Sequence, residues 1–275
     1  ALYKMYNEFT NTGSARKKTR KNEDKDDLGD FIRNVNSLEG QELHNYLVDH
    51  VDLPMTLNYL VGTVLVHQND NPHKNHFLYR DTVGTGEWMY LPWDNDLTWG
   101  SNWVGTSLHD IIYADVDQIK EGPKPSHDLS LIQPSHPLVN RQESREWNNH
   151  WNRLMNALLN DPVIRQMYLR RLRSGMDEFL GPPGTTDSYY DRRFVEHLST
   201  LVDDAQLDSE RWANPWVWGE DQSMDRTVEV IRQEYLEVRR EHLYVTHHID
   251  HATPPEIRVL LPEFTPATYW VPVDD

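Results

Sequence analysis

The stretch from Asp52 to Gly100, DLPMTLNYLVGTVLVHQNDNPHKNHFLYRDTVGTGEWMYLPWDNDLTWG, decides the interpretation of this chain. Asp52 is well placed to cap a helix whose first turn contains Pro54. The helix that follows is apolar on most sides, through Leu57, Tyr59, Leu60, Val61, Val64 and Leu65. A helix of this composition is typical of a protein interior. We therefore expect a buried helix that ends near His67.

A polar loop and a hairpin follow this helix in the sequence. Residues 67–75, HQNDNPHKN, contain a proline and three asparagines, which is typical of a loop. The runs His76–Arg80 and Glu87–Pro92 have strand character, and the glycines of DTVGTG between them suit a hairpin turn. A polar loop between rigid elements favours a functional site at this position.

Outside this stretch the spacing of apolar residues is mainly helical. It predicts two short amphipathic helices within residues 28–51 and a helical bundle within residues 147–238. Residues 1–9 have the composition of a strand, residues 10–27 that of a solvated loop, and residues 101–137 that of a long loop or short-helix segment. The predicted fold class is α+β, mainly helical.

Composition limits the possible functions. The 27 basic and 44 acidic residues give a net charge of −17, which opposes binding to nucleic acid or to anionic membranes. A phosphate ligand would therefore need bound cations. The absence of cysteine excludes disulfides, zinc–thiolate clusters and thiol nucleophiles. The longest apolar runs, such as Tyr59–Val66, are far shorter than the roughly 20 residues that span a bilayer.

Asp70 and Asn75 have the spacing of a protein-kinase catalytic loop. In protein kinases an aspartate orients the attacking hydroxyl, and an asparagine five positions later binds a metal ion. Asp70 precedes Asn75 by five positions, directly after the predicted buried helix. The spacing alone is weak evidence, and its position after the helix strengthens it. Lys74, between the two, is a candidate for neutralising phosphate charge.

A second set of candidate ligands follows the hairpin. The second metal carboxylate of a kinase also follows a β-hairpin, in a short loop that ends in glycine. Asp94 in PWDNDLTWG fits this place, with Asp96 beside it. If the strand continues through them, the two carboxylates lie on one face and can share a cation.

A histidine cluster near the end of the chain has no assigned role. His247, His248 and His251 are residue types that bind transition metals, but no acidic or cysteine partner stands at helical spacing. We interpret them as ordinary histidines. No Walker loop, Rossmann fingerprint or Gly-x-Ser-x-Gly elbow is present, so those enzyme classes are excluded.

These residues resemble the CotH kinase family, the spore-coat protein H type of atypical protein kinase. The resemblance rests on LYK at Leu2–Lys4, KNEDKDDLGDFIRNVN at 21–36, NDNPHKNHFLYR at 69–80 and PWDNDLTWG at 92–100. It covers roughly residues 1–100.

The resemblance implies a kinase-like fold that uses ATP with Mg²⁺ or Mn²⁺ to phosphorylate Ser or Thr of a protein. It makes Asp70 similar to the catalytic aspartate, and Asn75 and Asp94 similar to metal ligands, with Asp96 at a further motif position. We expect residues 1–262 to form the catalytic region, a kinase-like C-terminal lobe, and residues 263–275 a peripheral tail.

The segment before the buried helix contains no Gly-x-Gly pattern and no clear series of strands. We therefore expect most of the nucleotide-gripping N-terminal lobe to be missing, so that this chain alone is inactive. Two alternatives stay open: a non-catalytic cell-surface or adhesion module on the same fold, and a metal-dependent hydrolase that uses Asp94 and Asp96. The acidic surface favours basic Ser/Thr-containing segments as substrates. The sequence does not determine the compartment, and we favour a secreted or cell-surface location over a cytoplasmic one.

Overall fold

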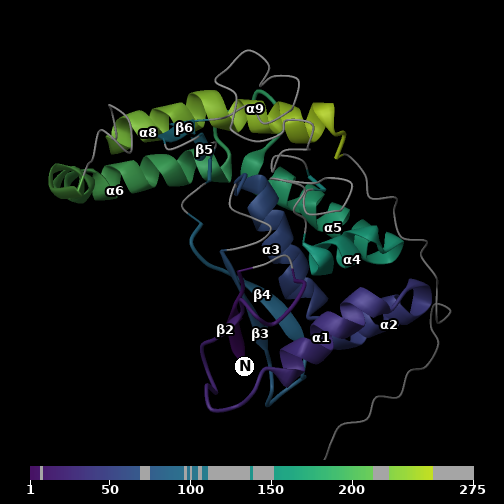
Figure 1. Cartoon of the computed structure of the whole chain (residues 1–275). Helices are drawn as coiled ribbons and strands as arrows, with labels where there is room; N and C mark the ends of the chain where they lie inside the picture. The colour runs from purple at the N-terminus through teal and green to yellow at the C-terminus, as the bar shows by residue number, and fades with distance from the viewer. Residues whose placement is uncertain are drawn as a thin grey trace, which may run out of the picture.

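The fold is α+β and mainly helical, as predicted (Figure 1). The computed structural model describes residues 1–6, 9–68, 75–95, 98–99, 101–104, 107–110, 137–138, 152–212 and 223–249. Within these ranges no helix is both long and apolar enough to cross a membrane. The predicted tail at 263–275 lies outside the described residues.

A four-stranded antiparallel sheet contains the N-terminal strand and the predicted hairpin. Its order is β2–β1–β3–β4, with β1 at Leu2–Lys4, β2 at Arg16–Lys17, β3 at His76–Arg80 and β4 at Trp88–Pro92. The strand expected within residues 1–9 and the hairpin are confirmed. The loop expected over residues 10–27 contains β2, because a two-residue strand is defined by its pairing with β1 rather than by its own pattern.

Two helices pack beside the sheet, as the periodicity predicts. They are α1 at Asp26–Ser37 and α2 at Gly40–His50. Phe31 of α1 stacks on Trp88 of β4, with ring centroids 4.9 Å apart and planes 5° apart. Such stacking adds to the free energy of burying two large apolar rings. It fixes the sheet against the helices.

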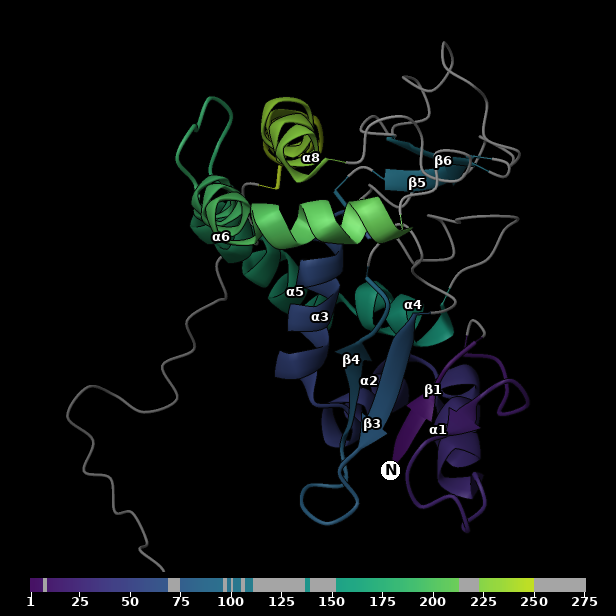
Figure 2. The same ribbon diagram turned by 90° about the vertical axis from the view of Figure 1, so that its left-hand side faces the viewer.

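Helix α3, Leu53–Leu65, is the predicted buried helix and runs from the sheet toward the C-terminal helices (Figures 1 and 2). The Asp52 carboxylate accepts a hydrogen bond from the Met55 backbone N–H at 3.0 Å, and Pro54 lies in the first turn. Nine residues of α3 are buried, and a narrow stripe through Asn58 and Gly62 is not.

Replacing Asp52 by alanine is expected to lower the free energy of unfolding by about 1 kcal/mol, because α3 then starts with an unpaired backbone N–H. Urea denaturation followed by circular dichroism measures the change. The control is Asp49→Ala, which removes an exposed carboxylate from α2. An equal loss in both variants would show that the capping bond does not stabilise α3.

Two further helices connect the sheet to α3. They are α4 at Arg153–Asn160 and α5 at Pro162–Gly175. The fully buried Asn152 caps α4 by accepting from the Met155 N–H, and it also accepts from the Tyr90 hydroxyl of β4, both at 3.1 Å. Gly175 lets α5 approach α3 closely, since a Cβ there would lie 3.1 Å from the Leu65 side chain.

The C-terminal helices lie across the end of α3 (Figure 1). They are α6 at Tyr189–Trp212, α8 at Met224–Val230 and α9 at Leu236–Arg240, with π-helical turns at Met176–Leu180, Ile231–Tyr235 and Glu241–Thr246. The helical interpretation of this half is confirmed. α6 buries little apolar surface: Asp191 is its only buried residue and Leu201 is 41% exposed.

A second hairpin lies in the segment predicted as a loop or short helices. Strands β5, Ser101–Val104, and β6, Ser107–Asp110, pair antiparallel. The prediction is therefore wrong for these residues. Strands of four residues are too short for their alternation to stand out from the surrounding polar sequence. Residues 111–136 lie outside the described part of the chain.

Candidate functional site

The end of α3 is joined to the segment that follows the β3–β4 hairpin. The Trp99 backbone N–H donates to the Val66 carbonyl at 2.8 Å. The Gln68 side chain donates to Asn95 Oδ1 at 3.4 Å. These two bonds hold the start of the polar loop against the segment that follows the hairpin.

Side chains from distant helices hold the last turn of α3. The Tyr235 hydroxyl donates to the Leu65 carbonyl at 3.1 Å, and Arg239 Nε donates to the Val64 carbonyl at 3.1 Å. These carbonyls are among those that a helix leaves unpaired at its C-terminus. The start of the polar loop is therefore fixed by residues about 170 positions later in the chain.

Trp99 anchors the other side of the site in the helical half. Its ring packs edge-on against three aromatic rings, with centroid distances of 5.0 Å to Tyr190, 4.9 Å to Phe194 and 5.6 Å to Tyr235. Edge-to-face contacts of this kind are favourable beyond the apolar area they bury. The segment after Asp94 thus has a fixed attachment.

His67 is buried directly before the polar loop. Its ring stacks on Tyr235, with centroids 6.4 Å apart. Burial, together with the positive charge of Arg239 and with His242, holds the pKa of His67 well below its ordinary value. A neutral imidazole therefore lies at the entrance to the loop.

Asn75 and Asp94 lie at the same end of the hairpin. His76, the first residue of β3, pairs with Pro92, the last residue of β4, so Asn75 comes directly before this pair and Asp94 two residues after it. Asn75 is buried and Asp94 is exposed. The two predicted metal ligands, 19 positions apart in sequence, are thus brought to one region by the strand register.

Backbone strain is concentrated around these two residues. Asn75 has φ 60° and Asp94 has φ 58°, while His67 and Trp99 have φ 51° and 58°. Non-glycine residues rarely adopt the left-handed region, and asparagine and aspartate tolerate it best. Such conformations cluster at functional sites, where the surrounding structure maintains them. The observation supports a site at this end of the hairpin.

The structure does not place every predicted site residue. Asp70, Lys74 and Asp96 lie outside the described residues. The expectation that Asp94 continues the strand is wrong, because β4 ends at Pro92 and Asp94 is left-handed. The alternation of side chains across a strand therefore gives no reason for Asp94 and Asp96 to share a face.

The oxygen atoms of Asn75 and Asp94 fit a hard divalent cation, since Mg²⁺ and Mn²⁺ prefer carboxylate and carbonyl ligands. In the described part of the chain no group of three or more His, Asp or Glu could hold a metal. A complete set would therefore draw on residues outside it, among which are Asp70 and Asp96. The donors that are described are compatible with the predicted metal.

Residues that sequence reasoning missed also line this region. A cavity of about 420 Å³ opens between α3 and β4 and is lined by Tyr59, Thr63, Gln68, Tyr90 and Asn95, among others. Its lining is mostly apolar. Asn95 stands inside the PWDNDLTWG motif, which was a usable signal, whereas nothing in the sequence marks Gln68 as its partner.

The histidine cluster is described only in part. The rings of His242 and His247 lie edge-on with centroids 4.4 Å apart, and His248 has φ 47°. His251 lies outside the described residues. His242 therefore joins this cluster, although the sequence spacing did not single it out.

Comparison with known proteins identifies the family of the chain. The family model described as CotH kinase protein matches residues 4–243. The chain is 36% identical over 92 residues to inner spore coat protein H of Bacillus subtilis (strain 168), which is 34% of this chain and 25% of that relative. The chain thus spans about a quarter of the length of the curated relative it matches. Because the family model covers most of its length, the chain belongs to the CotH kinase protein family.

Proposed function

We propose that this protein is an atypical protein kinase that transfers a phosphoryl group from Mg²⁺- or Mn²⁺-bound ATP to Ser or Thr of a protein. The observation that carries the proposal is the position of Asn75 and Asp94 at the same, open end of the β3–β4 hairpin, each in a strained left-handed conformation. A kinase needs an asparagine and an aspartate in this relation to the hairpin.

Each residue has a distinct role in the proposal. Asp70 accepts the proton of the attacking hydroxyl and orients it. Asn75 and Asp94, with Asp96, hold the divalent cation, which neutralises charge on the transferred phosphate. Lys74 adds a positive charge beside the phosphates. The buried Asn75 is fixed by the sheet, and the exposed Asp94 faces solvent, from which nucleotide and metal enter.

Residues 1–52 contain no recognisable loop that would cover the phosphates of a nucleotide. No Gly-x-Gly pattern precedes α3, and β1 and β2 are the only strands described there. Kinases cover the phosphates with a glycine-rich loop and pair them with a lysine from a strand. Within the residues given, the proposed contacts to ATP therefore run through the metal and the phosphates.

We also propose an extracellular or coat-associated location, since the matched relative is named an inner spore coat protein. The net charge of −17 favours basic Ser/Thr-containing segments as substrates, because opposite charge accelerates encounter. Incubation with Mn²⁺, radiolabelled ATP and a basic Ser-containing peptide tests the activity. No phosphopeptide at millimolar ATP would leave the non-catalytic surface module as the better explanation.

The metal site can be tested without turnover. Asp94→Asn is expected to weaken Mn²⁺ binding by at least about tenfold, because removing a ligand costs no less than removing its supporting shell. Titration calorimetry or the electron paramagnetic resonance signal of free Mn²⁺ measures the dissociation constant. Asp49→Asn on α2 makes the same charge change at an exposed position and is expected to bind as wild type does. Equal affinity in the two variants would rule Asp94 out as a ligand.

A further inference from the structure

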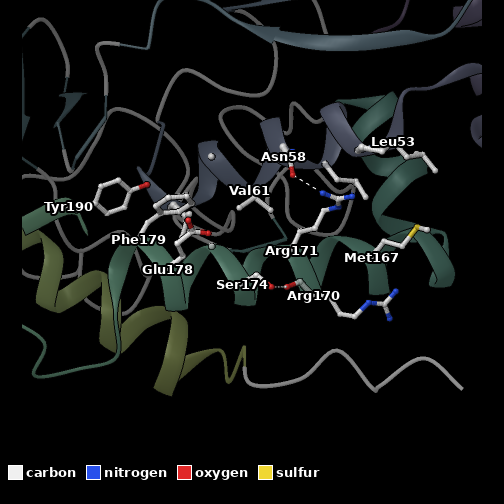
Figure 3. Close-up of a pocket in the computed structure, with 15 residues that line it drawn as sticks. Leu53, Asn58, Val61, Met167, Arg170, Arg171, Ser174, Glu178, Phe179 and Tyr190 are labelled. Carbon is white, nitrogen blue, oxygen red and sulfur yellow. Dashed lines mark hydrogen bonds between the residues drawn. The ribbon is translucent and has the colours of Figure 1, made fainter. Parts of the chain in front are cut away.

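A groove of about 800 Å³ lies between α3 and α5 (Figure 3). Its floor is apolar, formed by Leu57, Val61 and Leu65 of α3 with Phe179 beyond α5. Its rim is polar, with Arg170 and Arg171 of α5 at one end and Glu178 about two helical turns further along. Nothing in the proposed phosphoryl transfer uses this groove.

Gly62 lies in the floor of the groove, in the middle of α3. A Cβ at this position would meet nothing within 4 Å among the described residues. Glycine in a helix interior costs roughly 1 kcal/mol relative to alanine. Gly175 of α5 has a structural reason, because α3 packs so closely there that a Cβ would be crowded. Gly62 also borders the cavity between α3 and β4, and on neither side does a described side chain require a glycine, whereas a chain segment lying on the helix backbone does.

Arg170 and Arg171 have no carboxylate within ion-pair distance among the described residues, in a chain with 44 acidic side chains. Arg171 reaches across the groove and donates to Asn58 Oδ1 at 2.9 Å, and Arg170 points away from α5 (Figure 3). Both side chains are half-buried. The rim therefore offers two guanidinium groups to an acidic ligand.

The described chain ends beside this rim. Arg173 of α5 donates to the Ile249 carbonyl at 3.1 Å. Arg170 lies three positions before Arg173 and Ser174 one position after it, so all three share one side of α5. The residues after Ile249 thus start about one helical turn from the groove.

Residues 250–275 have the composition that the groove requires. They include five acidic residues and one arginine, with five prolines. Within them, Glu256 and Glu263 flank the run Ile257–Leu261, which is apolar except for Arg258. At about 3.1 Å per residue an extended proline-rich segment of this length spans roughly 80 Å. α5, with 14 residues, is only about 21 Å long.

We propose that the segment Glu256–Phe264 of this same chain docks in the α3–α5 groove. Its apolar run covers Leu57, Val61 and the bare backbone at Gly62, and Glu256 and Glu263 pair with Arg170 and Arg171. Tethering to Ile249 raises the effective concentration of the segment, so that modest contacts suffice for docking. This proposal is independent of phosphoryl transfer.

The test uses the full chain, whose lack of cysteine allows two single labels. Val163→Cys, exposed at the start of α5 and outside the groove, and Thr268→Cys carry spin labels, and pulsed electron resonance measures the distance between them. A docked segment gives a narrow distance distribution. Arg170→Glu with Arg171→Glu is expected to lose the narrow component, and adding Glu256→Arg with Glu263→Arg is expected to restore it.

Two substitutions of Gly62 distinguish a blocked groove from an unfolded protein. Gly62→Ala is expected to raise the thermal midpoint, and Gly62→Leu, which fills the floor, is expected to keep the fold and lose the narrow component. A broad distribution in the doubly labelled parent would overturn the proposal. A narrow distribution that persists in both the charge-reversed variant and Gly62→Leu would also overturn it. So would a narrow distribution that disappears on dilution with unlabelled chain, because a second copy would then occupy the groove.

Discussion

Asp70→Ala is expected to reduce the rate of phosphoryl transfer by a factor of about 10² to 10⁴, because positioned general base catalysis contributes that much. The measurement is the initial rate of peptide phosphorylation at saturating Mn²⁺ and ATP, so that a weak hold on the nucleotide does not mask the effect. Mn²⁺ affinity is expected to change little, since the proposal gives Asp70 to the substrate hydroxyl and Asn75 and Asp94 to the metal.

The reaction rate and the Mn²⁺ affinity, measured together, distinguish a kinase from a metal-dependent hydrolase. A metal-dependent hydrolase that uses Asp94 and Asp96 would lose activity with Asp94→Asn and retain most of it with Asp70→Ala. A kinase loses activity in both Asp70→Ala and Asp94→Asn, but it loses metal affinity only in Asp94→Asn. Asp49→Ala, an exposed substitution on α2, serves as the control and is expected to retain the parental rate.

Asp191→Ala is expected to lower the free energy of unfolding by about 3–5 kcal/mol, because the buried Arg240 guanidinium loses its nearer and more buried carboxylate and keeps only the exposed Glu237, at 3.4 Å, among the described residues. Arg240 is only 2% exposed, and its Nη2 lies 2.7 Å from Asp191 Oδ2. Arg240 also donates to the Leu180 carbonyl, so it cannot leave the interior without breaking a second contact. The pair joins α6 to α9 across the C-terminal half.

Urea denaturation measures this loss, with Asp187→Ala as the matched control. Asp187 pairs with Arg192 at 3.5 Å on the surface, where such pairs contribute about 0–1 kcal/mol. The double variant Asp191→Leu with Arg240→Met is expected to be more stable than Asp191→Ala, since no buried charge remains. Equal losses in the Asp187 and Asp191 variants would contradict this account.

The pair also makes stability depend on pH. Burial raises the pKa of Asp191, but hydrogen bonds from Ser188 and the charge of Arg240 outweigh it, so the pKa lies below its ordinary value of 3.8. A depressed pKa means that the unfolded state binds the proton more readily. The stability advantage of the parent over Asp191→Asn is therefore full at pH 7. It shrinks as the pH falls below about 4, through the pKa of the folded state.

The sequence by itself determined the elements nearest the site, because their signals are local. The cap at Asp52, the apolar surface of α3 and the glycine-containing turn between β3 and β4 depend on neighbours a few residues away. The same local spacing identified Asn75 and Asp94 as candidates, and the motifs around them identified the family. Periodicity likewise predicted that the C-terminal half is helical.

Tertiary structure alone decided what depends on distant residues. The partners of the last α3 carbonyls, the stacking of His67 on Tyr235 and the Asp191–Arg240 pair join positions that no sequence period relates. β2 and the β5–β6 hairpin are strands only because a partner pairs with them. Asp94 lies outside β4, which ends at Pro92, and its backbone is left-handed.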